Sequence, residues 1–253
     1  MTYNPEKYWE ERLSRRFNLS GVGYYGFSEY YNKWLYRGKI RALKKALAFY
    51  RIDIKNKTIC DIGCGTGFFV EFYKHLGAGN ILGIDITNIS IENLKLKYPK
   101  YNFIRADISS PLFKEIIKRK VDIVNIFDVL YHIKDDEAFE RAVSNLCDLI
   151  SNEGFILFSD LCGPEDINVA EHVKFRGKKA YEVILKKRGC NIIKIIPLYY
   201  FLNQPIFGKL HYWGIKIDNL LAPIYYYLDG LSLIHISEPT RPLYISYAVF
   251  CLK

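Results

Sequence analysis

The stretch Asp61-Ile62-Gly63-Cys64-Gly65-Thr66-Gly67-Phe68-Phe69 indicates the fold of this chain. It follows a short apolar run, residues 58–60, that is typical of the end of a buried strand, and it leads into residues 68–76, which are typical of the first turns of a helix. Glycine at every second position suits a turn that a ligand approaches closely, because glycine leaves no side chain in the way. The helix start directs free N–H groups over the turn, and Asp61 adds a carboxylate at the strand end.

The spacing of these glycines excludes two common nucleotide-binding turns. A dinucleotide site has the pattern G-x-G-x-x-G, which would place its third glycine where Phe68 or Val70 stands. A P-loop requires a Gly-Lys pair followed by Ser or Thr, which does not occur in this stretch. The pattern that remains is D-x-G-x-G-x-G.

Further strand-like runs follow, and an acid stands at or just after the carboxyl end of each. The runs cover residues 80–85, 101–108, 121–127 and 154–160, and the acids are Asp85, Asp107, Asp128 and Asp160. Open α/β sheets bind ligands outside the carboxyl ends of their strands. We therefore expect these acids and the glycine turn to lie around one site.

With these elements in this order, residues 40–200 resemble the class I S-adenosylmethionine-dependent methyltransferases. The resemblance implies an α/β fold, a doubly wound, mostly parallel sheet of the seven-stranded type, with an N-terminal helical cap. It also implies S-adenosylmethionine as the cofactor. Position by position, it places Asp61 near the methionine amino group, with Gly63, Gly65 and Gly67 around the methionine and ribose. Asp85 and Ile86 would hold the ribose, Asp107 and Ile108 the adenine, and Phe127 and Asp128 would form the wall beside the sulfonium.

The chain divides into four predicted parts: a helical cap at 1–50, the cofactor-binding core at 51–198, an aromatic-rich segment at 199–230 and a tail at 231–253. In the cap, Trp34 and Arg37 recur at helical spacing, and we expect them to contact the cofactor, with Arg37 reaching its carboxylate. The alternative is that these side chains only pack the helix on the core. Residues 199–230 suit a roof over an apolar pocket, a membrane surface, or half of a core whose partner is missing.

The tail is predicted to be non-native. Residues 231–241 and 245–252 match, in one reading frame, the translation of a sequencing-library adapter, and residues 242–244 fill the space of a sample index. The native chain is then expected to depart from this sequence at about Gly230 and to be longer. The competing interpretation is that residues 244–252, which are apolar and rich in strand-forming side chains, form a final strand.

Composition sets the remaining expectations. A chain of 253 residues with 50% hydrophobic content can bury one substantial core. Its net charge of +9 suits an acidic substrate, an anionic membrane surface or nucleic acid; the alternative is that the lysine content reflects an AT-rich genome. No nucleic-acid motif occurs, so we expect no nucleic-acid partner. The sequence has no apolar leader, no run of 18 uncharged apolar residues, no C-x-x-C pair and no metal-ligand cluster. These observations favour a cytoplasmic protein without a metal.

The resemblance implies methyl transfer to a small-molecule or lipid-like acceptor. Separately, the aromatic and weakly charged residues 199–230 suit a peripheral membrane contact. A base is needed only if the acceptor loses a proton. His132, just after the fourth strand, is the first candidate and His172, on the long connection after the fifth, is the second; packing or simple exposure are the alternatives. Aminopropyl transfer and a non-catalytic cofactor-binding role stay open as other functions. The acceptor atom and the oligomeric state are not fixed by the sequence.

Overall fold

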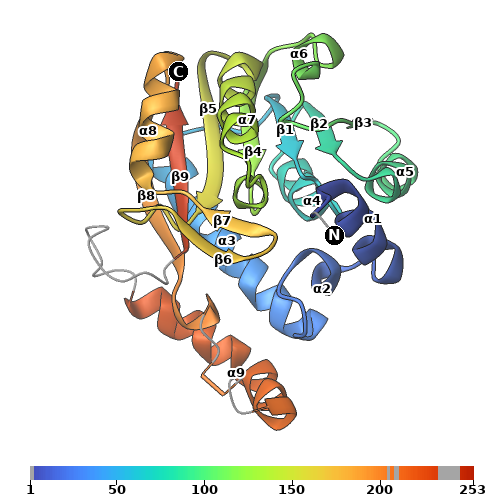
Figure 1. Ribbon diagram of the computed structural model, residues 1–253, viewed down its shortest axis with the longest axis vertical. Coiled ribbons are helices and arrows are strands. Elements are labelled where there is room, and N and C mark those ends of the chain that lie inside the picture. Colours follow the sequence, from blue (N-terminus) through green and yellow to red (C-terminus); the bar gives the residue numbers. More distant parts are fainter. Residues whose placement is uncertain (1–2, 204–205, 208–210, 233–245) are drawn as a thin grey trace.

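The structure, a computed structural model, describes residues 3–203, 206–207, 211–232 and 246–253. A seven-stranded sheet in the order β3-β2-β1-β4-β5-β9-β8 runs through its centre (Figure 1). Strands β1 to β5 are parallel, and β9 is antiparallel to both of its neighbours. The sheet strands are β1 (Thr58–Ile62), β2 (Asn80–Asp85), β3 (Asn102–Arg105), β4 (Val121–Ile126), β5 (Ile150–Asp160), β8 (Asn191–Tyr199) and β9 (Ser246–Leu252). The expected doubly wound, mostly parallel sheet is confirmed.

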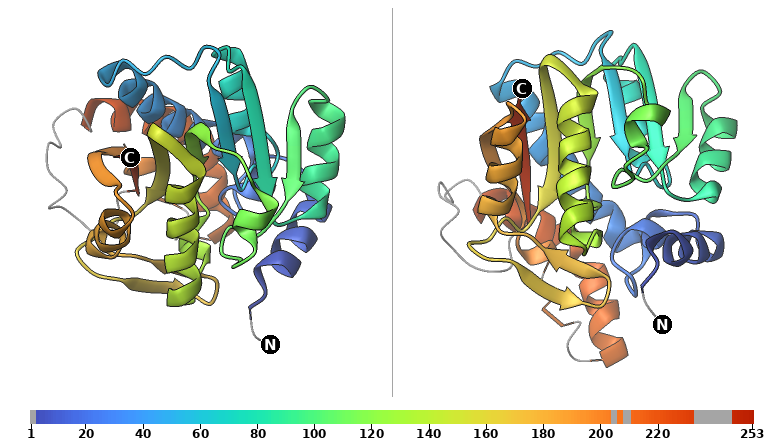
Figure 2. Two further views of the ribbon diagram at one scale, coloured as in Figure 1. Left: turned by 90° about the horizontal axis from the view of Figure 1, so that it is seen from above. Right: turned by 45° about the horizontal axis from the view of Figure 1, so that its top comes forward.

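Helices cover both faces of the sheet (Figure 2). Successive strand residues point to opposite faces, so Ile59 packs into one core and Cys60 into the other. The core on the Ile59 side is closed by α3 (Glu29–Phe49), α4 (Phe68–His75) and α5 (Asn88–Lys97). The core on the Cys60 side is closed by α6 (Phe113–Ile116), α7 (Asp136–Leu149) and α8 (Lys178–Lys187). Burial on both faces explains why these strands read as near-continuous apolar runs.

The predicted N-terminal cap consists of α1 (Pro5–Arg15), α2 (Leu19–Val22) and the long α3. The Asn4 side chain caps α1, Asn18 caps α2 and Ser28 caps α3, each by accepting from backbone N–H groups of the first turn. Helix α3 continues through Gly38 without a break. A Cβ atom at Gly38 would lie 3.0 Å from the ring of Tyr199, so this glycine allows α3 to approach β8 closely.

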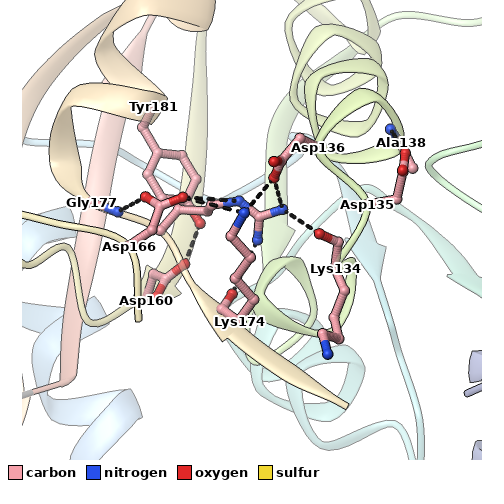
Figure 3. A network of polar contacts seen from close by, with 10 residues as sticks. Lys134, Asp135, Asp136, Ala138, Asp160, Asp166, Lys174, Gly177 and Tyr181 are labelled. Carbon is pink, nitrogen blue, oxygen red and sulfur yellow. Dashed lines mark hydrogen bonds and ion pairs between the residues drawn. The ribbon is translucent and has the colours of Figure 1, made fainter. Parts of the chain in front are cut away.

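The connection after β5, predicted as a loop at 161–177, contains a hairpin of β6 (Ile167–Ala170) and β7 (Val173–Phe175). A polar network fixes the base of this hairpin (Figure 3). The buried Arg176 donates to the Lys134 carbonyl at 2.9 Å and to Asp136 at 2.7 Å, and Lys174 contacts the same Asp136 carboxylate at 2.6 Å. The hairpin is thereby held against the segment between β4 and α7, at the same end of the sheet as α1 (Figure 1).

Strand β9 occupies the position of the closing strand, between β5 and β8. Its residues belong to the tail predicted to be non-native. The pairing follows from an apolar, strand-forming composition that the adapter translation shares, so the origin of the tail stays a prediction. Before the tail, the short 3-10 turn η2 (Phe201–Asn203) leads toward α9 (His211–Ser232), which packs on α3. Among the described residues, no helix is long and apolar enough to cross a membrane.

Candidate cofactor and active site

The glycine turn between β1 and α4 adopts a backbone that excludes side chains. Gly63, Gly65 and Gly67 all have left-handed φ values, of 69°, 48° and 81°. A Cβ atom at Gly63 would lie 2.2 Å from the Val129 side chain, and one at Gly65 would lie 2.9 Å from Val22. The turn is therefore closely packed on two sides, and any larger residue would have to displace a wall of the space above it.

Asp85 joins the tip of β2 to this turn. Its Oδ2 accepts the Gly65 N–H at 2.8 Å, while its Oδ1 accepts the Thr87 backbone N–H at 3.0 Å and the Thr87 hydroxyl at 2.7 Å. Burial raises the pKa of Asp85, and the hydrogen bonds from Thr87 and Gly65 oppose that rise. The carboxylate is thus held in one orientation at the point where the turn and the second strand meet.

A cavity of about 830 Å³ opens over the carboxyl ends of the strands. Strand tips, the segment after β4 and the helical cap all contribute to its wall. Of the predicted site residues, those lining it are Gly63, Gly65, Asp85, Ile86, Asp107, Ile108, Phe127, Asp128 and His132. The cap supplies residues that were not predicted, among them Trp9, Leu13, Val22 and Tyr36. The structure therefore brings together most, but not all, of the residues expected around the cofactor.

Asp61 lies at the end of β1 with an almost fully buried side chain, 1% exposed, outside the cavity wall. Its Oδ1 accepts from the Asn125 amide at 2.7 Å, and its Oδ2 has no hydrogen-bond partner among the described residues. Burial raises the pKa of Asp61 to about 7, although the hydrogen bond from Asn125 opposes the rise. A buried carboxylate oxygen without a partner indicates a place where a donor or a cation is missing.

Gly67 and the pair of Trp34 and Arg37 are not at the cavity. A Cβ atom at Gly67 would lie 2.5 Å from Leu94, so this glycine allows α4 to pack on α5. The Trp34 ring lies 5.3 Å from that of Tyr226 on α9, and the Arg37 guanidinium stacks on Trp34 at 4.2 Å. The expected contact of Trp34 and Arg37 with the cofactor is therefore corrected: they lie on the side of α3 that faces α9.

Lys39 is a residue of the site that the sequence did not reveal. Its fully buried ammonium forms an ion pair with Asp128, whose Oδ1 also accepts the Ser159 hydroxyl at 2.9 Å. Burial alone would raise the pKa of Asp128, but the Lys39 charge and the Ser159 hydroxyl outweigh it, so the pKa lies below its usual value. Asp128 is thus a fixed carboxylate in the wall, held in a left-handed backbone conformation with φ of 60°.

The two candidate bases stand in different positions. His132 ends the 3-10 turn η1 (Leu130–His132) and lines the cavity, and its Nδ1 lies 2.9 Å from the carbonyl oxygen of His172. Burial lowers the pKa of His132 to about 4, so the ring is neutral near pH 7. Since a carbonyl only accepts, Nδ1 is the protonated nitrogen and Nε2 keeps a free lone pair.

His172 lies at the turn of the β6–β7 hairpin and is absent from the residues lining the cavity. Its ring stacks on Tyr8 at 5.1 Å and lies parallel to that of His132 at 5.8 Å. Its position indicates a structural role, in which the backbone carbonyl orients His132. The neighbouring Glu171 reaches the cavity instead.

Comparison with known proteins gives consistent matches. Residues 31–195 match the family model of a methyltransferase domain. The ubiquinone biosynthesis O-methyltransferase of Neisseria meningitidis serogroup C is 29% identical over 114 residues, which cover 43% of this chain and 46% of that protein. The chain spans about half the length of the curated relatives it matches.

Solved structures show the same fold. Magnesium protoporphyrin IX methyltransferase from Synechocystis PCC 6803, with bound S-adenosylmethionine, has a TM-score of 0.60 at 15% identity and covers 100% of this chain and 98% of its own. The N-methyltransferase NodS from Bradyrhizobium japonicum WM9, in complex with S-adenosyl-L-homocysteine, has a TM-score of 0.58 at 13% identity and covers 97% and 98%. At these identities the likeness concerns the fold.

Proposed function

Because this chain belongs to the methyltransferase domain family, we propose that it transfers the methyl group of S-adenosylmethionine to a small-molecule or lipid-like acceptor. The observation that carries the proposal is the turn of Gly63 and Gly65, fixed by Asp85, beneath a cavity of about 830 Å³ at the ends of the parallel strands. A space of this size accommodates a cofactor together with part of an acceptor.

The residues present fit the cofactor. At Gly63 and Gly65 a side chain would collide with the cavity walls, and the buried Asp61 Oδ2 lacks a partner that an ammonium group or its hydrogen-bonded neighbour would supply. Asp85 and Ile86 would hold the ribose, Asp107 and Ile108 the adenine, and Phe127 and Asp128 the region of the sulfur. When bound, the cofactor supplies a methyl carbon made electrophilic by the positive sulfur.

His132 is the proposed proton acceptor. Its Nε2 carries the free lone pair, and the residue lines the same cavity as Asp128 and Phe127. An acceptor hydroxyl would have to release its proton on methylation, and the His132 Nε2 would take it up. A cavity wall that fixed the acceptor beside His132 would contribute by positioning, which is a large part of the acceleration available to such a transfer.

Calorimetry tests the cofactor site. We expect S-adenosylmethionine and its demethylated product to bind wild type, and we expect Gly65→Arg to abolish binding because the new side chain enters the wall formed by Val22. Gly163→Arg is the matched control, since the nearest atom to a Cβ there lies 3.8 Å away. Wild type that binds neither molecule would overturn the proposal.

Turnover is tested separately, by release of the demethylated cofactor in the presence of hydroxylated aromatic, amine and isoprenoid acceptors. Formation of product with one acceptor class, lost in Gly65→Arg, is the expected result. Tight binding without turnover on any class would instead favour a non-catalytic binding protein.

A further inference from the structure

Helix α9 has two faces of opposite character. Its buried positions recur every three or four residues, at Gly214, Asp218, Ala222, Tyr225 and Asp229. Its exposed positions, apart from Lys216, are apolar or aromatic. At the same spacing they form an outer stripe of Trp213, Ile217, Leu220, Ile224 and Tyr227, which Leu231 of the predicted tail extends. Leu220 is 75% exposed and Tyr227 is 65% exposed, so the stripe is not covered by the described part of the chain.

Both acids of α9 point away from the stripe. Asp218 accepts the Phe207 backbone N–H and the Tyr225 hydroxyl, and Asp229 accepts the backbone N–H groups of residues 200–202. From residue 213 to 231, the one exposed charge on the helix is Lys216. A continuous apolar stripe of this length on a surface helix indicates an interaction site rather than a requirement of the fold.

A row of basic side chains lies beside the outer stripe. This basic ridge follows one face of α3 and consists of Lys33, Arg37, Arg41 and Lys44. Arg37 stacks on Trp34, whose ring lies 6.4 Å from that of Tyr227, and Arg41 donates to the Tyr226 carbonyl at 2.7 Å. Because α3 and α9 pack on each other, the basic ridge and the outer stripe adjoin on one surface.

We propose that this surface binds the face of a bilayer that contains anionic lipids. Apolar side chains of a helix lying in the interface enter the acyl boundary, tryptophan and tyrosine settle at headgroup level, and arginine and lysine contact anionic headgroups. A two-fold symmetric dimer formed through the outer stripe would bring two basic ridges toward each other, and their like charges would repel. Anionic lipid headgroups would instead neutralise the ridge, so a bilayer fits this surface better than a second copy.

The surface also adjoins the cavity. Helix α2 ends at Val22, which lines the cavity. The loop that follows is held to η2, which packs on α9, by Tyr24, whose hydroxyl donates to the Asn203 carbonyl at 3.1 Å. The Ser28 hydroxyl, at the end of this loop, donates to Asn219 on α9. Membrane binding therefore places the cavity close to the lipid surface. The membrane contact does not rest on the proposed methyl transfer.

Vesicle co-sedimentation tests the proposal with the full chain. We expect wild type to bind vesicles of phosphatidylcholine and phosphatidylglycerol, to bind phosphatidylcholine alone at least tenfold more weakly, and to be released by salt. Leu220→Glu/Ile224→Glu and Arg37→Glu/Lys44→Glu should each weaken binding at least tenfold. The matched controls are Leu96→Glu, 84% exposed on α5, and Lys95→Glu/Lys100→Glu, and both should bind as wild type does.

Thermal melts by circular dichroism and calorimetry with S-adenosylmethionine are run on every variant, so that loss of folding is separated from loss of lipid binding. Wild type that stays in solution with anionic vesicles overturns the proposal, as does equal weakening in stripe variants and controls. A concentration-dependent dimer that Leu220→Glu/Ile224→Glu abolishes would assign the surface to a second copy instead.

Discussion

The Nδ1 atom of His132 lies 2.9 Å from the carbonyl oxygen of His172, so one predicted base orients the other. The two residues are 40 positions apart, and they meet because the polar network around Arg176 holds the β6–β7 hairpin over η1. The arrangement gives His132 a defined neutral tautomer at the cavity. His172 positions it through the backbone carbonyl, so the role does not depend on the imidazole ring of His172.

The first prediction concerns the pH dependence of turnover. If His132 accepts the proton, kcat/KM should be constant from neutral pH down to about pH 5 and fall as the pH passes the lowered pKa of His132, about 4. His132→Gln should reduce kcat by roughly 10² to 10⁴. His75→Gln, a change to a histidine on the surface of α4, is the control and should leave the profile unchanged. An acidic limb near the ordinary histidine pKa of 6.5 would contradict this assignment.

The second prediction concerns the hairpin anchor. Arg176 is 2% exposed, and Arg176→Met removes its hydrogen bonds to the Lys134 carbonyl and to Asp136. We expect a loss of about 2 kcal/mol in the free energy of unfolding, because a partly buried carbonyl and a carboxylate lose their donor. We also expect faster proteolytic cleavage within residues 167–175. Lys179→Met, at an exposed position on α8, is the matched control. Unchanged cleavage would show that the hairpin is held by other contacts.

The third prediction concerns the ion pair of Lys39 and Asp128. Lys39→Met leaves the Asp128 carboxylate partly buried beside an apolar side chain, and we expect a loss of about 3 kcal/mol, measured by urea unfolding. Because the lost partner is a charge, Lys39→Met/Asp128→Asn should recover part of that loss, giving a coupling energy in a double-mutant cycle. Lys33→Met, which removes the ion pair of an exposed lysine with the half-buried Glu29, serves as the control. Additive losses would mean that the two side chains do not interact.

The residues at the strand ends could be predicted because each stands in a recognisable local sequence pattern. Gly63 and Gly65 stand at the spacing that a turn under a ligand needs, and Asp85 and Asp107 follow apolar runs directly; all four line the cavity. The backbone conformation of a turn and the end of a strand are encoded by neighbouring residues, so they can be read without knowing the rest of the structure.

The cap residues at the site were harder to predict, because they contact residues that are distant in the sequence. Trp34 and Arg37 share one face of α3, and Tyr36 and Lys39 share another. Helical spacing alone could not decide which face turns to the cavity, where Tyr36 lines the wall and Lys39 pairs with the wall residue Asp128. Lys39 belongs to the site because it pairs with Asp128, which is 89 residues away in the sequence. The hairpin at 167–175 was missed for a different reason: its strands have only 4 and 3 residues, and none of these residues is fully buried.

The last prediction concerns stability without ligand. Burial raises the pKa of Asp61 from 3.8 to about 7, so between these values the folded state binds a proton that the unfolded state has released. The free energy of unfolding should therefore fall as the pH rises through this window. Asp61→Asn removes this contribution and should leave a smaller slope, measured by urea unfolding at several pH values, whereas the exposed control Asp53→Asn should keep the wild-type slope. Asp160, whose pKa burial also raises to about 7, accounts for a remaining slope. Stability that rises with pH in wild type would show that Asp61 is ionised in the folded protein.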